Sequence, residues 1–392
     1  MSMIILIRYG EIHLKGQNRP YFERLLMGEI RNAVKKFPGA TVERGDGRYY
    51  VENFDEADGE DIIAALSKVF GVHSLTPAYE VEKDIDAIAA EAIRQMDEYI
   101  LENGKKSYKV DTKRSDKRFP MKSNEISAEI GGRILEHDPS LVVDIHKPEM
   151  RVFVEIRDKA AYVYTKVIPG QGGMPIGSNG KAMLLISGGI DSPVAGHMVA
   201  KRGVRLSAVH YYSFPYTSER ARDKVIELTK QVAAYAGEIK LHLVHFTDIQ
   251  MAIYEKCPHQ HLTLIMRRFM MRIADRLARE SGMQAVVTGE SIGQVASQTI
   301  ESLAVTDSVV ELPVFRPLIG MDKIEIIERA QQIGTYETSI LPYEDCCTVF
   351  VPKHPTTRPN MESIIKSESV LDVDALIEDA LSKSEVIIVN AD

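Results

Sequence analysis

A glycine-rich turn between an apolar run and a helix constrains the fold of this chain more than any other stretch. Leu184-Leu-Ile is followed by Ser187-Gly-Gly-Ile-Asp-Ser192 and then by Pro193. The apolar run predicts a buried strand, and the two glycines let the backbone turn tightly and approach a ligand. Ser192 is expected to cap the next helix, with Pro193 at its first position. Such a helix start favours an anion in the turn, although a turn without any ligand is the alternative.

The segments around this turn alternate between apolar strands and longer helices. We expect strands at 182–186, 206–211, 240–246 and 284–288, and helices at 192–202, 218–236, 263–281 and 322–333. Near-continuous apolar strands joined by helices predict an α/β fold with a doubly wound parallel sheet. In such sheets ligands bind beyond the carboxyl ends of the strands, which is where the glycine-rich turn lies.

The N-terminal half has a different order of predicted strands and helices. Its first part predicts a ferredoxin-like β-α-β-β-α-β order, with strands at 4–8, 41–44, 48–52 and 73–80 and helices at 19–37 and 60–70. A second α+β unit follows, with helices at 84–102 and 123–137 and strands at 107–112, 141–146, 151–157 and 161–167. Residues 169–180 are dense in glycine and proline and therefore predict a domain boundary.

Composition indicates the compartment and the class of partners of the protein. The three cysteines among 392 residues are too few for a disulfide scaffold and indicate a reducing, cytoplasmic environment. No apolar run approaches the roughly 18 residues that a membrane span requires, so we expect no membrane association. The formal net charge of −8 argues at first against nucleic acid. However, it averages an acidic stretch at 362–392 with a basic segment at 105–122.

The basic segment is the candidate RNA-binding site. Its basic residues are Lys105, Lys106, Lys109, Lys113, Arg114, Lys117, Arg118 and Lys122. Tyr108 and Phe119 are interleaved with them, and this pattern suits phosphate contact and base stacking on folded RNA. Taken alone, such a charge run is also typical of a solvated surface.

Ser187–Ser192 resembles the PP-loop of ATP pyrophosphatases, which cleave ATP between its α- and β-phosphates. Over its whole length the chain resembles the tRNA 4-thiouridine synthetase (ThiI) family. The other motifs that carry this resemblance are Arg8-Tyr-Gly-Glu-Ile-His-Leu-Lys-Gly16, Phe214-Pro-Tyr-Thr-Ser-Glu-Arg220, Met266-Arg-Arg-Phe-Met-Met-Arg272, Thr288-Gly-Glu-Ser-Ile-Gly-Gln-Val-Ala-Ser-Gln298, Arg316-Pro-Leu-Ile319 and Tyr343-Glu-Asp-Cys-Cys-Thr-Val-Phe350. The resemblance implies a ferredoxin-like domain at 1–76, a THUMP RNA-binding domain at 77–168, a linker at 169–180 and a PP-loop domain at 181–392. It also implies a short form that lacks the rhodanese domain of some members.

The resemblance also assigns residues to ATP and to catalysis. It implies ATP contacts from Leu185, Ile186, Ser187, Gly188, Gly189, Asp191, Ser192, His210, Tyr211, Arg267, Gly289 and Gln298. Asp191 would act on Mg²⁺ or on the pyrophosphate side, and Lys323 on the charge that develops during adenylation. The alternatives are a helix-capping Asp191, a solvated Arg267, and strand-core roles for Leu185 and Ile186. We expect no other metal site, although an iron–sulfur cluster built from the three cysteines stays open.

Cys346 and Cys347 are the candidate sulfur carriers, because sulfur transfer needs a thiolate that accepts a persulfide. The motif favours Cys347 as the nucleophile, a one-residue slip favours Cys346, and plain packing of both is the alternative. Cys257 lies outside the motifs and is read as incidental. Without a rhodanese domain, the persulfide would come from a cysteine desulfurase.

The expected function is therefore ATP-dependent transfer of persulfide sulfur to uridine 8 of tRNA, through an adenylated uridine, by a cytoplasmic homodimer. One rival is a PP-loop enzyme that adenylates another tRNA base or a small molecule. Another rival is a non-catalytic RNA-binding or sulfur-carrier protein. A further role in thiamine thiazole synthesis stays open.

Overall fold

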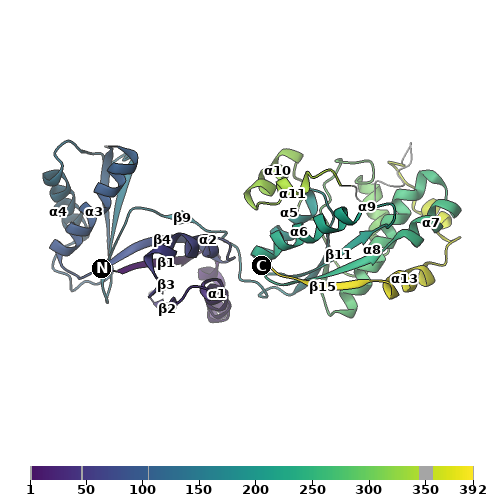
Figure 1. Cartoon of the computed structure of the whole chain (residues 1–392), viewed down its shortest axis with the longest axis horizontal. Helices are drawn as coiled ribbons and strands as arrows, with labels where there is room; N and C mark the ends of the chain where they lie inside the picture. Colours follow the sequence, from purple (N-terminus) through teal and green to yellow (C-terminus); the bar gives the residue numbers. More distant parts are fainter. Residues whose placement is uncertain (1, 46, 105, 344–355, 392) are drawn as a thin grey trace. The chain divides into compact units, whose positions relative to one another are not determined.

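The computed structural model describes residues 2–45, 47–104, 106–343 and 356–391 of the chain (Figure 1). The chain forms two compact units, Met1–Gly173 and Met174–Asp392, so the division falls within the predicted linker. Each unit is described by itself below.

The first unit combines one large sheet with four α-helices. Its elements are β1 (Ser2–Tyr9), η1 (Glu11–Asn18), α1 (Arg19–Val34), β2 (Thr41–Gly45), β3 (Arg48–Glu52), η2 (Glu56–Asp58), α2 (Gly59–Leu66), β4 (Val72–Val81), α3 (Ile85–Asn103), β5 (Ser107–Arg114), α4 (Ser123–His137), β6 (Val142–Val143), β7 (Met150–Ile156), β8 (Ala161–Tyr164) and β9 (Ile168–Pro169). The strand expected at 141–146 is thus reduced to two residues.

The sheet of this unit runs without a break through both predicted N-terminal domains. The strand order is β2-β3-β1-β4-β8-β7-β5-β6, and β9 pairs with β4. Strand β4 pairs with β1 along most of its length and with β8 at its end, where Tyr79 faces Val163. The predicted boundary between residues 76 and 77 therefore lies inside a shared strand.

The face of this sheet that carries Glu155 encloses a small core of its own. Ile4, Leu6, Tyr50, Tyr162 and Tyr164 are buried together there. Strands β3 and β7 are four positions apart in the sheet, which would separate them by about 19 Å if the sheet were flat. Arg48 of β3 nevertheless forms an ion pair with Glu155 of β7 at 2.8 Å. The sheet must therefore curl strongly around this core.

Glu155 binds the two parts of the curled sheet together. This residue is 1% exposed, and its carboxylate accepts hydrogen bonds from Arg8, Arg48, Arg157 and Tyr164 at 2.6–3.0 Å. Burial alone would raise the pKa of Glu155, but the charges of Arg48 and Arg157 and the hydrogen bonds outweigh burial and lower this pKa to about 2. Glu155 thus stabilises the unit above pH ~4.5, and this contribution is lost as the pH falls toward 2.

Replacing this carboxylate should loosen the curled sheet. We expect Glu155→Gln to destabilise the first unit by about 3 kcal/mol at pH 7, because it leaves three arginines around a neutral group. The difference from wild type should shrink as the pH falls below 4. Hydrogen exchange of β1 and β7 amides in urea measures it, with exposed Glu149→Gln as the control. Equal protection of β1 and β7 in wild type and Glu155→Gln would contradict the assignment.

The second unit is an α/β domain. Its elements are β10 (Lys181–Leu185), α5 (Asp191–Ala200), β11 (Arg205–Tyr212), α6 (Glu219–Ala236), β12 (Ile239–His245), α7 (Thr247–Lys256), η3 (His259–His261), α8 (Leu262–Glu280), β13 (Ala285–Val287), α9 (Ile300–Asp307), β14 (Val314–Phe315), α10 (Lys323–Gln332), α11 (Tyr336–Ser339), α12 (Met361–Glu368), α13 (Val373–Ser382) and β15 (Glu385–Val389).

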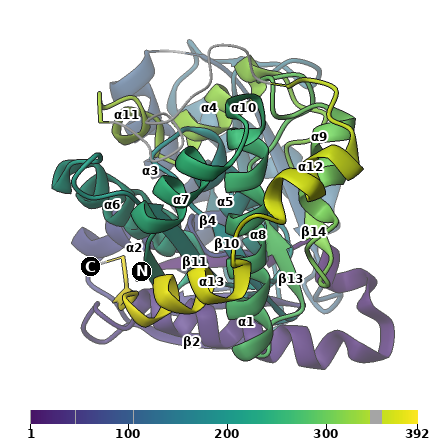
Figure 2. The same ribbon diagram turned by 90° about the vertical axis from the view of Figure 1, so that its right-hand side faces the viewer.

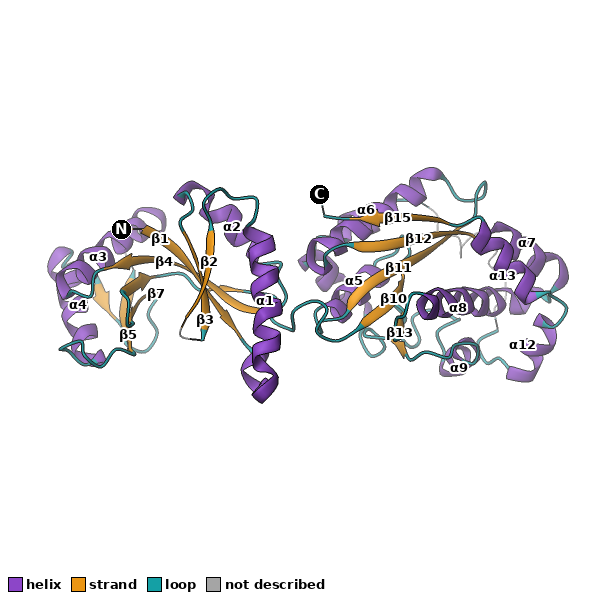
Figure 3. Cartoon of the chain, turned by 90° about the horizontal axis from the view of Figure 1, so that it is seen from below, coloured by secondary structure: helices purple, strands orange, loops and turns teal. Residues whose placement is uncertain are grey.

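In the described part of this unit, the sheet has six strands in the order β14-β13-β10-β11-β12-β15. The pairs among β14, β13, β10, β11 and β12 are parallel, as the apolar strands predict, whereas β15 adds an antiparallel edge. Helices α5 and α6 pack on one face, and α7, α8 and α13 form the other helical layer (Figure 3). The carboxyl ends of β10, β11 and β13 therefore meet at one edge, where the glycine-rich turn lies.

The acidic C-terminal stretch is folded onto this unit. Helices α12 and α13 pack against α8, as Figure 2 shows. Glu368 of α12 is 5% exposed and forms ion pairs with Arg268 at 2.9 Å and Arg272 at 2.7 Å. Although burial opposes it, hydrogen bonds from these two arginines lower the pKa of Glu368. One carboxylate of the acidic stretch is thus part of the core.

Candidate active site

The loop between β10 and α5 is closed by a serine. The Ser192 hydroxyl accepts a hydrogen bond from the Ser187 N–H at 2.9 Å, and the Ser187 hydroxyl accepts one from Gly189 N–H at 3.3 Å. The prediction that Ser192 caps the helix is wrong, because α5 begins at Asp191 and its N-cap is Ile190. Ser192 lies in the first turn instead and ties the two ends of the loop together. No side chain caps the start of α5, so its N–H groups favour an anion.

Gly289, just beyond β13, allows a second strand end to approach this loop. A Cβ atom on Gly289 would lie 2.8 Å from the Asp191 carbonyl carbon and 2.8 Å from the Ser192 nitrogen. Both neighbours are backbone atoms, which cannot rotate away as a side chain can. A residue without a side chain is therefore required here.

A cavity of ≈380 Å³ opens beside the loop. Its wall includes every residue predicted to contact ATP except Gly188 and Gly189. The residues of the wall that the sequence analysis did not assign are Thr263, Met266, Met270, Met271, Thr288, Glu290, Val295 and Ser297. Several of them stand within the motifs quoted above, but only their contacts in three dimensions assign them to the cavity.

One wall of the cavity is apolar with a few fixed polar groups. Met266 and Met270 contribute from α8, and the Tyr211 hydroxyl donates to the Met270 carbonyl at 2.5 Å. A His210 ring nitrogen lies 3.1 Å from the carbonyl oxygen of Ile186. Methionines adapt to flat ligands, and such a wall with convergent polar groups is typical of a small-molecule site.

Gln298 contributes a buried oxygen to this wall. Its Oε1 atom has no hydrogen-bond partner among the described residues. A buried acceptor without a partner costs about 1–3 kcal/mol, and a ligand donor would remove that cost.

Removing the Gln298 Oε1 atom should weaken ATP binding without lowering the stability of the ligand-free protein. Gln298→Met is expected to lower ATP affinity about five- to tenfold while the melting temperature of the ligand-free protein stays equal or rises. Calorimetric titration with ATP and thermal denaturation measure the two effects. Exposed Gln332→Met of α10 is the control that should change neither. A variant that melts earlier and binds ATP normally would contradict this role.

Asp191 of the cavity wall forms an ion pair with a residue 132 positions away, and because both side chains are partly exposed, we take this pair to mark the mouth of the cavity. The Lys323 ammonium lies 2.6 Å from Asp191 Oδ1, and the Gln294 amide donates to Asp191 Oδ2 at 2.8 Å. Lys323 is the first residue of α10, where its charge opposes the helix dipole, whereas Asp322 caps that helix with its side chain. The structure therefore brings together Asp191 and Lys323, two of the four predicted catalytic residues, whereas Cys346 and Cys347 lie outside the described residues.

Arg267 lies within a second group of charges on the cavity wall. It forms an ion pair with buried Glu290, which also accepts a hydrogen bond from Arg316 at 2.7 Å. Arg316 is held in turn by Asp307. Neighbouring Arg268 faces Glu368 instead, so two adjacent arginines of one motif have different tasks.

The cysteine predictions fall in two parts. Cys346 and Cys347 lie outside the described residues. Cys257 is buried, its thiol donates to the Ser367 carbonyl at 3.3 Å, and burial raises its pKa. A thiol of raised pKa is a poor nucleophile, which agrees with an incidental Cys257.

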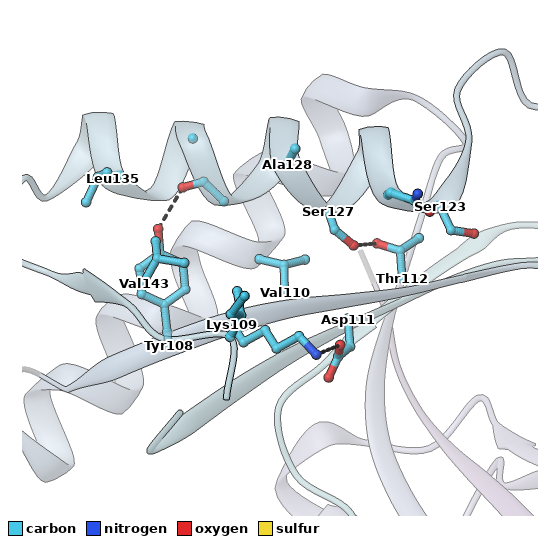
Figure 4. A pocket seen from close by; sticks show the side chains of 14 residues that line it. Tyr108, Lys109, Val110, Asp111, Thr112, Ser123, Ser127, Ala128, Leu135 and Val143 are labelled. Atoms are coloured by element: carbon cyan, nitrogen blue, oxygen red, sulfur yellow. Dashed lines mark hydrogen bonds and ion pairs between the residues drawn. The ribbon is translucent and has the colours of Figure 1, made fainter. Parts of the chain in front are cut away.

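The basic segment lies in the first unit, on β5 and the loop that follows it. Figure 4 shows Lys109 paired with Asp111, at 2.7 Å, beside a cavity of ≈550 Å³ between β5 and α4. Lys106 and Arg118 also have carboxylate partners, and Arg114 donates to backbone carbonyls. Lys113, Lys117, Arg118 and Lys122 are exposed, whereas Lys105 lies outside the described residues.

The predicted base-stacking role of the two aromatic residues is wrong. Tyr108 is fully buried and its hydroxyl donates to the Gly131 carbonyl at 2.7 Å, toward α4 (Figure 4). Phe119 is 7% exposed and packs in the same core. Their alternation with lysines reflects a strand and loop whose other side is buried.

The described residues form neither a metal-binding cluster nor a membrane-spanning helix. Within the ranges given above, no group of three or more His, Cys, Asp and Glu side chains is arranged to hold a metal ion. No helix in the described part of the chain is long and apolar enough to cross a membrane.

Known proteins resemble this chain over its whole length. Family models described as "Thiamine biosynthesis protein (ThiI)", "ThiI ferredoxin-like domain" and "THUMP domain" match residues 177–373, 4–76 and 82–166. A "Probable tRNA sulfurtransferase" of Acetivibrio thermocellus is 54% identical, covering 100% of both chains, and one of Alkaliphilus metalliredigens is 52% identical, covering 98% of both. A solved "4-thiouridine synthetase - RNA complex with bound ATP" has a TM-score of 0.90 at 36% identity and covers 100% of both chains.

Proposed function

The chain belongs to the ThiI family of tRNA sulfurtransferases, and from that premise we propose that it uses ATP to replace O4 of a tRNA uridine with sulfur, giving 4-thiouridine. The solved relative described as a 4-thiouridine synthetase was captured with RNA and ATP, which supports these two substrates. Uridine 8 is the proposed target.

The observation that carries the proposal is the cavity whose mouth holds the Asp191–Lys323 pair. The phosphates of ATP would lie against the loop Ser187–Ser192, where uncapped N–H groups favour anions. The base would lie along the methionine wall, near Gln298. The α-phosphate is then placed at the mouth, where a second substrate can reach it.

For adenylation at the mouth, the protein needs to stabilise developing charge and does not need to form a covalent intermediate. O4 of the uridine attacks the α-phosphorus of ATP while N3 of the ring gives up its proton to water, the bond to the β-phosphate oxygen breaks, and pyrophosphate leaves. Lys323 stabilises the negative charge that develops on the phosphoryl oxygens. The Asp191 carboxylate is a hard oxygen donor beside the phosphate loop, which fits one protein ligand of a Mg²⁺ ion that enters with ATP and neutralises its phosphates.

The sulfur step is assigned to Cys346 and Cys347. A cysteine desulfurase would leave a persulfide on one of them, and its terminal sulfur would attack C4 of the adenylated uridine and displace AMP. The second thiolate would then attack the sulfur of the first cysteine, which releases 4-thiouridine and leaves a disulfide for an external thiol to reduce. The two cysteines are adjacent in the sequence, so one thiol is available to attack the other, which supports this order of steps.

The first unit would bind the tRNA. Lys113, Lys117, Arg118 and Lys122 are exposed on one short segment and can contact phosphates, with affinity that falls steeply as salt rises. The family match to a THUMP domain at 82–166 covers this segment. We also propose a cytoplasmic homodimer as the working form.

Reconstitution with purified components tests the proposal. The full chain is mixed with unmodified tRNA transcript, ATP, Mg²⁺, cysteine and a cysteine desulfurase, and the digested nucleosides are analysed by mass spectrometry. We expect 4-thiouridine only when ATP is present, loss of product in the Cys346→Ala/Cys347→Ala double variant, and product from Cys257→Ala. Full activity of the double variant, or no thiouridine from the wild type, would refute it.

A further inference from the structure

We propose that Ile292, Val295 and Ile324 form an apolar surface that receives the extruded uracil ring beside the Asp191–Lys323 pair. The inference rests on the proposed function, because it names where that site takes up its second substrate. The sequence analysis gave these three residues no role in ATP binding or in catalysis.

Two segments of the second unit, a first one that contains Gln294 and a second one that contains Lys323, meet at the Asp191 carboxylate. Gln294 on the first segment and Lys323 on the second each bond one oxygen of this carboxylate, at 2.8 and 2.6 Å. The segments are also joined directly, since the Ser291 hydroxyl donates to the Met321 carbonyl at 2.8 Å. The neighbours of Gln294 and Lys323 therefore lie around the mouth of the cavity.

Three apolar residues on these two segments are exposed. Ile292, Val295 and Ile324 are 50%, 49% and 68% exposed, and Val295 also lines the cavity. Leaving such side chains in water forgoes the free energy of burying them, and a ligand that covers them recovers it. Apolar surface that adjoins a binding cavity is typical of a place that a ligand covers.

The reaction calls for such a surface at this point. O4 of the uridine must reach the α-phosphate at the mouth, so the base has to leave its place in the folded tRNA and lose its stacking. Enzymes that act on a base hold it outside the stack against apolar or aromatic side chains. The faces of uracil are apolar and its edge is polar, which matches aliphatic side chains next to the amide of Gln294 and the ammonium of Lys323.

A tRNA that lacks only the target base tests this inference. Two transcripts are compared, one with the target uridine and one with an abasic residue at that position, in the presence of a non-hydrolysable ATP analogue. We expect the wild type to bind the uridine transcript about tenfold more tightly. The Ile292→Ala/Val295→Ala/Ile324→Ala variant should bind both transcripts equally and keep a melting temperature close to that of the wild type, which shows that it is folded.

Ile388→Ala, at a 54% exposed position of β15, is the matched control and should keep the tenfold preference. If the triple variant retains the preference, or if the wild type shows none, the inference is overturned. Failure of the proposed function would look different, because the wild type would then form no thiouridine in the reconstituted reaction. The single alanine variants repeat the comparison if the triple variant binds ATP poorly.

Discussion

Lys323→Met should lower 4-thiouridine formation about 100- to 1,000-fold. The substitution keeps most of the length of the side chain but removes the charge that lies 2.6 Å from Asp191 at the mouth of the cavity. A positive charge held where phosphoryl charge develops acts mainly in the transition state, so its loss lowers kcat. ATP affinity should fall less than about tenfold, because the loop Ser187–Ser192 still binds the phosphates. Pyrophosphate release under single-turnover conditions measures the effect.

The control for this variant is Lys230→Met, at an exposed position of α6, which should keep wild-type rates. Asp191→Asn should also lose activity, and combining it with Lys323→Met should cost much less than the sum of the two single effects, since the residues act as a pair. Strictly additive losses, or a Lys323→Met enzyme with wild-type kcat, would contradict a joint role at the α-phosphate.

Gly289→Ala should abolish tight ATP binding with one added methyl group. That carbon would lie 2.8–2.9 Å from backbone atoms of Asp191 and Ser192, so the loop or β13 must shift. We expect at least a tenfold loss of ATP affinity and about 1–3 kcal/mol of destabilisation, the usual cost of overpacking. Calorimetric titration with ATP and urea denaturation measure both quantities.

Gly320→Ala is the matched control in the same unit, because its added carbon would meet no atom within 4 Å. It should leave ATP affinity unchanged. If Gly289→Ala binds ATP as the wild type does, the close approach of β13 to the phosphate loop is not needed for binding, and our account of this glycine is wrong.

The elements that the sequence predicted well are those with strong local signals. The helix expected at 123–137 is α4, Ser123–His137, and the apolar strands around the PP-loop pair in parallel. The resemblance was carried by short motifs, and the residues they assign to ATP lie around one cavity, with Gly188 and Gly189 outside its lining.

What sequence reasoning missed depends on partners far along the chain. The burial of Glu368 depends on Arg268, 100 residues away, so the sequence of the acidic stretch does not show that one of its carboxylates is buried. The shared strand β4 could not be foreseen, because its second partner, β8, follows it by about 80 residues. Tyr108 and Phe119 seemed available for stacking because charge pattern alone does not show which side of a strand is covered.

In the proposed reaction, ATP activates the uridine oxygen for displacement by sulfur. A tRNA with oxygen-18 at C4 of the target uridine tests it directly. O4 becomes the bridging oxygen of the adenylate and leaves with AMP, so we predict that the AMP formed during thiolation carries the heavy oxygen. Mass spectrometry of AMP after one turnover reads this out, with unlabelled tRNA in oxygen-18 water as the control for hydrolysis. Thiouridine formed together with unlabelled AMP would contradict the account.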